Sequence, residues 1–320
     1  MSSELLMVEQ EPGGGDAAPW ILDRHGRRMR GRDDSRRTAE LRGGLAGHER
    51  VRAAPADVAR EEVERIVGLL HERDYLEALA GISWDEPTLM PEWAPPGLPA
   101  DSPVWAGVVR TAFEGMRTAI AAANRIVAGD RFAYALCRPP GHHAGPAWMG
   151  GYCYLNTAAA AAQVLCDGGM RPVAIVDVDF HFPTGTAAVV ARMRDVKLHS
   201  LHATTLENVP WKPVAEREHE RFFDFAGAPD EDTYLEALDA SIEELRRSTR
   251  AIVLSLGYDT VGGDPHGSWS FEPDLFARVG RRLADSGLPV CVVQEGGYAL
   301  ETLAACSSAF ARGLLEGDPR

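Results

Sequence analysis

Apolar runs and amphipathic segments alternate along most of the chain. Uninterrupted runs rich in valine, isoleucine and alanine predict buried strands at residues 132–137, 173–176, 196–201, 251–256 and 290–294. Apolar side chains at helical spacing predict helices between them at 108–128, 157–165, 186–193, 231–247, 273–286 and from about 300 onward. Strands that alternate with helices favour a mostly parallel sheet covered on both faces, an α/β fold of three αβα layers.

The first hundred residues are less regular. A short strand is predicted at 4–8, and helical spacing predicts two helices within 55–79 with a break near 71–74. Residues 82–104 contain too many prolines for a helix or a central strand. We therefore expect a long ordered loop there, of the kind that often borders a functional site.

Residues 24–52 form the one basic stretch of the chain and lack interleaved aromatic residues. We interpret this stretch as a solvated, partly flexible or peripheral segment, and contact with an acidic partner or acidic substrate is the alternative. The expected organisation is an N-terminal segment at 1–54 followed by a main catalytic domain at 55–320, within a single domain overall.

The composition narrows the classes of function. A chain of 320 residues with 45% hydrophobic and 25% charged residues can bury a large core. The net charge of −14 disfavours nonspecific binding to nucleic acid and mildly favours cationic ligands. No leader segment or membrane-length apolar run is present, and the five cysteines form no CxxC motif. We therefore expect a cytoplasmic protein without nucleic-acid or membrane partners.

Polar groups follow four of the predicted strands directly. They are His142 and His143 after 132–137, Asp177 to His181 after 173–176, Asp259 after 251–256 and Tyr298 after 290–294. Ligands of open parallel sheets bind beyond the carboxyl ends of the strands. These side chains are therefore expected to converge on one edge of the sheet.

Asp179, His181 and Asp259 are candidate metal ligands. Asp179 and His181 stand one residue apart in an extended chain, so their side chains project to the same side. Catalytic zinc needs three protein ligands and an open position, and Asp259 can supply the third. Two carboxylates make a hard site that iron, cobalt or manganese could also occupy. The alternative is that both aspartates cap helices and that His181 is an ordinary loop histidine.

His142 and His143 can act as acid and base, because the imidazole pKa lies near neutral pH. Asp177 is placed to fix the tautomer of His142. Tyr298 follows two glycines and can donate its hydroxyl to the oxyanion that develops on a scissile carbonyl. The combination predicts hydrolysis of an amide.

These motifs resemble the histone deacetylase superfamily, and within it the acetylpolyamine amidohydrolases. The blocks that carry the resemblance are 137–145, 150–156, 177–181, 255–259 with Asp264-Pro265, and 295–298. The resemblance implies an arginase-like αβα fold, zinc bound by Asp179, His181 and Asp259, a His142/His143 dyad and Tyr298 as carbonyl polariser. It also implies that Gly151 and Tyr152 line a narrow acyl-lysine-like tunnel. A structural potassium or sodium ion is implied near Asp177, Asp179, His181 and Ser200.

Two features depart from the family pattern. The family usually continues His-Gly-Asn/Asp-Gly-Thr-Gln after the metal-binding histidine, whereas this chain reads Phe-Pro-Thr-Gly-Thr-Ala at 182–187. Thr184 therefore stands where a carboxylate or amide orients the second dyad histidine, which predicts a lowered pKa for His143 and reduced or retuned activity. The 82–104 loop is shorter than the insertion of the polyamine enzymes; its Glu86, Glu92 and Asp101 could meet a cationic substrate or be solvated.

The leading hypothesis is a zinc-dependent amidohydrolase that uses metal-activated water to remove an acyl group from an amine. Its substrate could be an acetylpolyamine, an acyl-lysine-like side chain or a small biosynthetic amide, and a homodimer is possible. The alternative is a binding or regulatory protein that kept the fold and lost turnover. An arginase-type dinuclear site would need further ligands that residues 177–181 do not supply.

Overall fold

A parallel sheet of eight strands forms the centre of the computed structural model, which describes residues 3–10 and 17–317. Every neighbouring pair in the sheet is parallel. In spatial order the strands are β4 (Val51–Pro55), β1 (Leu5–Glu9), β5 (Phe132–Leu136), β10 (Val290–Gln294), β9 (Ala251–Leu256), β6 (Val173–Asp177), β7 (Val196–Ala203) and β8 (Glu220–Phe225). The predicted mostly parallel sheet is confirmed.

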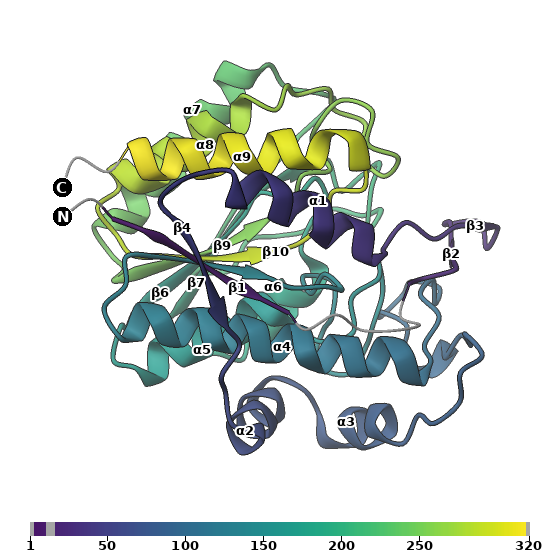
Figure 1. Ribbon diagram of the computed structural model, residues 1–320. Coiled ribbons are helices and arrows are strands. Elements are labelled where there is room, and N and C mark those ends of the chain that lie inside the picture. The colour runs from purple at the N-terminus through teal and green to yellow at the C-terminus, as the bar shows by residue number, and fades with distance from the viewer. Residues whose placement is uncertain (1–2, 11–16, 318–320) are drawn as a thin grey trace.

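Helices cover both faces of this sheet (Figure 1). One face carries α1 (Ser35–Ala46), α7 (Glu231–Arg246), α8 (Leu275–Asp285) and α9 (Leu300–Glu316). The other face carries α4 (Ala106–Val127), α5 (Thr157–Asp167) and α6 (Thr184–Val190), and α2 (Arg60–Leu70) and α3 (Arg73–Ala80) pack on this side. The three-layer αβα architecture is therefore confirmed.

Local sequence sets where several helices begin. The side chain of Asn156 accepts the backbone N–H of Ala159 at the start of α5, and Asp230 accepts that of Thr233 at the start of α7. The central strand β5 is buried on both faces, with Tyr134 in one core and Ala133 and Ala135 in the other. Alternation of side chains along the strand thus supplies both hydrophobic cores.

The structure agrees with the less regular predictions in the first half of the chain. The strand predicted at 4–8 is β1, and the two helices predicted within 55–79 are α2 and α3, which break at His71. Residues 82–104 form a loop with one short 3-10 helix, η1 (Pro91–Trp93). A separate antiparallel hairpin pairs β2 (Trp20–Leu22) with β3 (Arg28–Arg30). No helix in the described ranges is long and apolar enough to span a bilayer.

The interpretation of residues 24–52 as a solvated, partly flexible segment is wrong over α1 and the start of β4. Helix α1 packs on α9, and its Arg37 is only 1% exposed. Strand β1 pairs with β4 on one side and with β5 on the other, so the sheet takes strands from both sides of residue 55. The apolar contacts of α1 come mainly from Leu41, Leu45 and the backbone of Gly44, a stripe too narrow to recognise among so many arginines.

Two further differences lie near the other sheet edge. Strand β8 was not predicted, because it is an edge strand whose aromatic and charged side chains are mostly half-buried or exposed. The helix predicted at 186–193 is α6, which begins earlier, at Thr184, directly after Pro183. Since α6 starts there, Thr184 stands at the entry of a helix rather than in a free loop.

Two adjacent glycines test the packing of α1. A Cβ at Gly44 would lie 2.1 Å from the Ala304 carbonyl oxygen and 2.2 Å from Ser307 Oγ, whereas a Cβ at Gly43 meets nothing within 4 Å. We expect Gly44→Ala to lower the free energy of unfolding by about 1–3 kcal/mol through overpacking. Gly43→Ala is the matched control and should raise it by about 0.5–1 kcal/mol through helix propensity. Denaturant unfolding measures both, and equal effects would argue against this packing.

Candidate active site

The structure brings the predicted site residues to the carboxyl edge of the sheet. His142 and His143 lie in the loop after β5, Asp177 ends β6, and Asp179 and His181 follow it. Asp259 follows β9, and Tyr298 follows β10. The five strands β5, β10, β9, β6 and β7 are consecutive neighbours, so their ends form one continuous rim.

Asp179, His181 and Asp259 form a compact cluster. Their ligand atoms all lie within 4.8 Å of one another, and His181 Nδ1 is 3.3 Å from Asp179 Oδ1 and 3.1 Å from Asp259 Oδ2. Backbone N–H groups orient the carboxylates: Gly296 donates to Asp179 and Phe180 donates to Asp259. One imidazole and two carboxylates at this spacing match the donor set of a divalent metal.

Two glycines keep space beside this cluster. A Cβ at Gly257 would lie 2.1 Å from Asp179 Oδ2, and a Cβ at Gly296 would lie 2.6 Å from the same oxygen and 2.8 Å from Asp259 Oδ2. Any larger residue at either position would displace the carboxylates. The backbone is therefore shaped to hold these oxygens in place, and the donor set fits a cation.

The cluster concentrates negative charge inside the protein. Burial acts to raise the pKa of Asp179, but the charges of His142 and His181 outweigh it and hold that pKa well below its usual range. Burial and the nearby Asp179 raise the pKa of Asp259 to about 7. Burial acts to lower the pKa of His181, yet its hydrogen bonds to Asp179 and Asp259 raise it to about 10. Without a cation the cluster therefore holds protons.

The histidine pair has two different environments. The rings of His142 and His143 lie 4.1 Å apart between centroids. His142 Nδ1 is 3.2 Å from Asp177 Oδ2, so a carboxylate supports its cationic form. His143 Nδ1 is 3.0 Å from Thr184 Oγ1, a neutral partner. The structure thus pairs both imidazoles with the residues that the sequence suggested.

These partners separate the two pKa values. Burial acts to lower the pKa of His142, but Asp179 and Asp177 outweigh burial and raise it well above the usual value. Burial lowers the pKa of His143, and the neighbouring charges of His142 and His181 lower it further. A cationic imidazole and a neutral imidazole therefore lie side by side, which is the arrangement that acid–base chemistry uses.

Tyr298 is held from two sides. Its backbone N–H donates to Asp264 Oδ2 at 2.6 Å, and the Arg37 guanidinium carbon lies 4.4 Å from the centroid of its ring. The Tyr152 and His266 rings lie 5.5 Å and 4.7 Å from the Tyr298 ring, measured between centroids. Burial raises the pKa of Tyr298 well above 10, so its hydroxyl stays protonated and can donate.

A buried ion network behind Tyr298 escaped the sequence reasoning. Arg37 donates to the carbonyl oxygens of Gly297 and Glu295, at 2.6 Å each, and to Asp33 Oδ1 at 2.5 Å. Arg138 donates to the other oxygen of Asp33 at 2.9 Å. The network fixes the turn before Tyr298. Asp34 indicates only where α1 begins, by accepting the N–H of Arg36, and does not reveal the network.

Glu295 was also missed as a supporting residue. Its carboxylate accepts the backbone N–H groups of Gly141 and His142 at 2.7 Å and 3.0 Å, and it accepts the hydroxyl of Ser255. Burial raises the pKa of Glu295 to about 7. Glu295 therefore ties the histidine loop to the strand that leads to Tyr298.

Gly151 lines a hollow beside His143, and the buried Tyr152 follows it; the tunnel that the resemblance implies stays a prediction. A Cβ at Gly151 would lie 2.4 Å from His143 Cδ2, so the glycine backbone rests against that ring. The Gly151 N–H donates to Asp101, and the Tyr152 N–H donates to Ser102. A hollow of about 30 Å³ reaches from Gly151 to His143 and Thr184. Asp101 lines this hollow, whereas Glu86 and Glu92 are exposed and lie outside its lining.

The four residues expected near a monovalent cation lie close together. Asp177 and Ser200 are partners in the β6–β7 register, and the Asp179 N–H donates to Asp177 Oδ1 at 3.1 Å. The Ser200 hydroxyl lies 2.9 Å from His202 Nδ1. A potassium or sodium site there stays a prediction.

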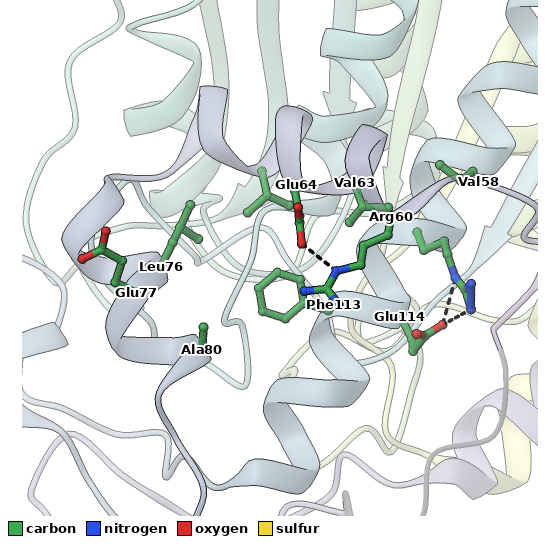
Figure 2. A pocket seen from close by; sticks show the side chains of 11 residues that line it. Val58, Arg60, Val63, Glu64, Leu76, Glu77, Ala80, Phe113 and Glu114 are labelled. Carbon is green, nitrogen blue, oxygen red and sulfur yellow. Dashed lines mark hydrogen bonds and ion pairs between the residues drawn. The ribbon is translucent and has the colours of Figure 1, made fainter.

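A larger cavity lies away from this chemistry. It lies between α2, α3 and α4, and Figure 2 shows the side chains that line it. Its volume is about 560 Å³, and none of the predicted site residues lines it. Its charged side chains are largely paired, Arg60 with Glu64 and Arg117 with Glu114. Cavity size alone therefore does not mark the place where the predicted site residues converge.

Solved structures with the same architecture define the fold class. The chain superposes on the crystal structure of acetylpolyamine aminohydrolase from Burkholderia pseudomallei with a TM-score of 0.83, 28% identity and 98% of each chain covered. It also superposes on the HDA15 HD domain with a TM-score of 0.80 at 22% identity, which shows the fold alone. The protein is thus an α/β protein of the arginase and deacetylase fold class.

Sequence comparison then gives the family. The histone deacetylase domain matches residues 34–314. The chain is 34% identical over 286 residues to acetylpolyamine amidohydrolase 1 of Pseudomonas aeruginosa, covering 78% of this chain and 81% of that relative. It is 39% identical over 212 residues to the acetylpolyamine amidohydrolase of Mycoplana ramosa, covering 62% of this chain and 61% of that relative. The chain belongs to the histone deacetylase domain family.

The charge of the cluster predicts how a metal should bind. Histidine binds a metal only when it is neutral, and the pKa of free His181 is about 10. Protons therefore compete with the metal, and we expect zinc affinity to rise between about pH 6 and pH 8. Isothermal titration calorimetry measures this dependence.

The matched pair for that titration is His181→Gln, which should lose most zinc affinity, and His25→Gln, which changes an exposed histidine outside the site. Unchanged affinity in His181→Gln would contradict the assignment of the cluster. An affinity that did not depend on pH would contradict its protonation.

Proposed function

We propose that this chain is a metal-dependent deacetylase that hydrolyses the amide bond of a small acylated amine. The observation that carries the proposal is the pair of adjacent imidazoles with opposite pKa shifts beside the Asp179–His181–Asp259 cluster. Membership of the histone deacetylase domain family supports the same reaction class.

Zinc is the metal we propose, held by Asp179, His181 and Asp259. A zinc ion in such a site acts as a Lewis acid and lowers the pKa of water. Two carboxylates with one imidazole also suit iron, cobalt or manganese. The space kept by Gly257 and Gly296 around the two aspartates supports this assignment.

The remaining side chains divide the proton transfers and the charge stabilisation among them. His143, with its lowered pKa, is neutral near pH 7 and accepts a proton from the attacking water. It then returns that proton to the nitrogen of the leaving amine. His142 stays cationic beside Asp177 and stabilises developing negative charge. Tyr298 donates its hydroxyl to the oxyanion that forms on the carbonyl.

Three classes of substrate are consistent with this proposal. Acetylated polyamines are suggested by the names of the Pseudomonas and Mycoplana relatives. Acyl-lysine-like side chains and small biosynthetic amides share the same scissile bond.

The cytoplasmic location is supported by five free cysteines, all buried. The expected homodimer stays a prediction.

Turnover separates an enzyme from a protein that has kept only the fold. We expect His143→Ala to lower kcat by about 10²–10⁴-fold through loss of the base, and Tyr298→Phe by about 10²–10³-fold through loss of the oxyanion donor. Metal content, measured by elemental analysis, should not change in either variant. Tyr75→Phe is the matched control, because its hydroxyl donates to the Tyr154 carbonyl outside the site.

A metal-loaded wild-type protein that cleaved no acylated amine would favour the binding or regulatory alternative. Full activity in Tyr298→Phe would show instead that another group stabilises the oxyanion.

Thr184 predicts a pH dependence with a definite sign. The base must be neutral, so the acidic limb of kcat/KM follows the pKa of His143. Thr184→Asp places a carboxylate beside His143 Nδ1, raises that pKa and should shift the limb upward by about one pH unit or more. Thr184→Asn keeps a neutral partner and is the matched control, with a shift of at most about 0.3 unit. An identical limb in Thr184→Asp and the wild type would disprove the role of Thr184.

A further inference from the structure

The β2–β3 hairpin is attached to the entrance of the site. The Leu22 N–H donates to the Asp101 carbonyl oxygen at 2.9 Å, and the Arg32 N–H donates to Tyr152 Oη at 3.2 Å. Figure 1 shows the hairpin beside the sheet, next to the start of α1. Both contacts are made to segments that border the hollow above His143, so the charges of the hairpin act on whatever enters it.

Arginines dominate the charge of this hairpin. Arg24 lines the hollow together with His143 and Thr184. Arg32 lies toward the Tyr298 side, where burial, His181 and then Arg32 lower the pKa of His266 to about 3. In the described part of the chain, no carboxylate lies within ion-pair distance of four hairpin arginines: Arg24, Arg28, Arg30 and Arg32. The hairpin therefore carries arginines that no ion pair among the described residues neutralises, and one of them, Arg24, lines the hollow.

The two carboxylates that line the hollow are already engaged. Asp23 accepts Arg27 Nε at 2.7 Å and the backbone N–H groups of His25 and Arg27. Asp101 accepts the N–H of Gly151 and the hydroxyl of Ser102, and burial raises its pKa. Neither carboxylate is free to bind a substrate ammonium without losing these bonds.

The local charge opposes the charge of the whole protein. The chain carries a net charge of −14, which would favour a cationic substrate at long range. At physiological ionic strength, charges are screened beyond about 8 Å. A substrate in the hollow therefore responds mainly to groups nearby, and within residues 20–32 five arginines face one aspartate.

We infer that this site selects acylated amines whose far end carries an anionic group, such as a carboxylate, over the cationic polyamines. The inference rests on the deacetylase function proposed above. Arg24 and His143 line the same hollow, so an amide that reaches His143 from this side passes beside the hairpin. A terminal ammonium in the same place would be repelled.

Three matched probes test this preference on the zinc-loaded full chain. They are 6-acetamidohexanoate, N-acetylcadaverine and the neutral N-pentylacetamide, which differ mainly in the charge at the far end. We expect kcat/KM to be highest for the carboxylate and at least about tenfold lower for the ammonium. Added salt should narrow the gap between them, because it screens the hairpin.

Charge variants assign the preference to the hairpin. Arg24→Gln and Arg32→Gln should each lower the carboxylate-to-ammonium ratio of kcat/KM several-fold. Arg281→Gln removes one exposed arginine from α8 and is the control, with an unchanged ratio. An equal or higher rate with N-acetylcadaverine in the wild type would overturn the inference while supporting the deacetylase function.

A binding measurement separates the two proposals. Hydroxamic acids with a terminal carboxylate or ammonium should bind the zinc-loaded protein in the same order as the amide probes. If none of the three amides is cleaved and the carboxylate hydroxamate still binds more tightly, the deacetylase function fails and the charge selectivity stands as a property of the site. If the two hydroxamates bind equally, the selectivity fails.

Discussion

Buried negative charge at the carboxyl edge of the sheet is the constraint on which the site depends. Asp177, Asp179, Asp259 and Glu295 are all buried within one rim. Burying carboxylates costs free energy unless each is paired and hydrogen-bonded. The protein compensates them with His142, His181 and a set of backbone N–H groups. This compensation is incomplete, because the pKa of Asp259 is still raised to about 7. A divalent cation would supply the missing positive charge.

A second buried ion network couples the N-terminal segment to the turn that precedes Tyr298. Asp33 is shared by Arg37 and Arg138, and Arg37 continues to the backbone on either side of Gly296. Breaking one partner of such a network leaves an unpaired buried charge, which is costly. Helix α1 therefore stabilises the fold and also fixes the turn that presents Tyr298, although it lies more than 250 residues away in sequence.

The sequence was most informative where an apolar run marked a strand and polar residues followed directly after it. Central strands such as β6 and β9 are uninterrupted apolar runs, and the polar residues that follow them could be placed at one edge. The edge strands β4 and β8 and the helix α1 were missed, because their half-exposed faces resemble loops. Thr184 as the partner of His143 could be predicted, because residues 182–187 were compared with the family pattern. Arg37 could not be foreseen, because its main partners are backbone carbonyls, which no residue type reveals.

One departure from the family pattern lies in the same small volume as an arginine of the hairpin. Thr184 and Arg24 line one hollow, and neither adds negative charge beside His143. A carboxylate at 184 would support an imidazolium at His143, but it would also repel an anionic substrate. A neutral threonine at 184 neither supports an imidazolium at His143 nor repels an anionic substrate. Under the proposed preference for an anionic far end, the neutral Thr184 and the positive Arg24 form one electrostatic arrangement around a neutral imidazole.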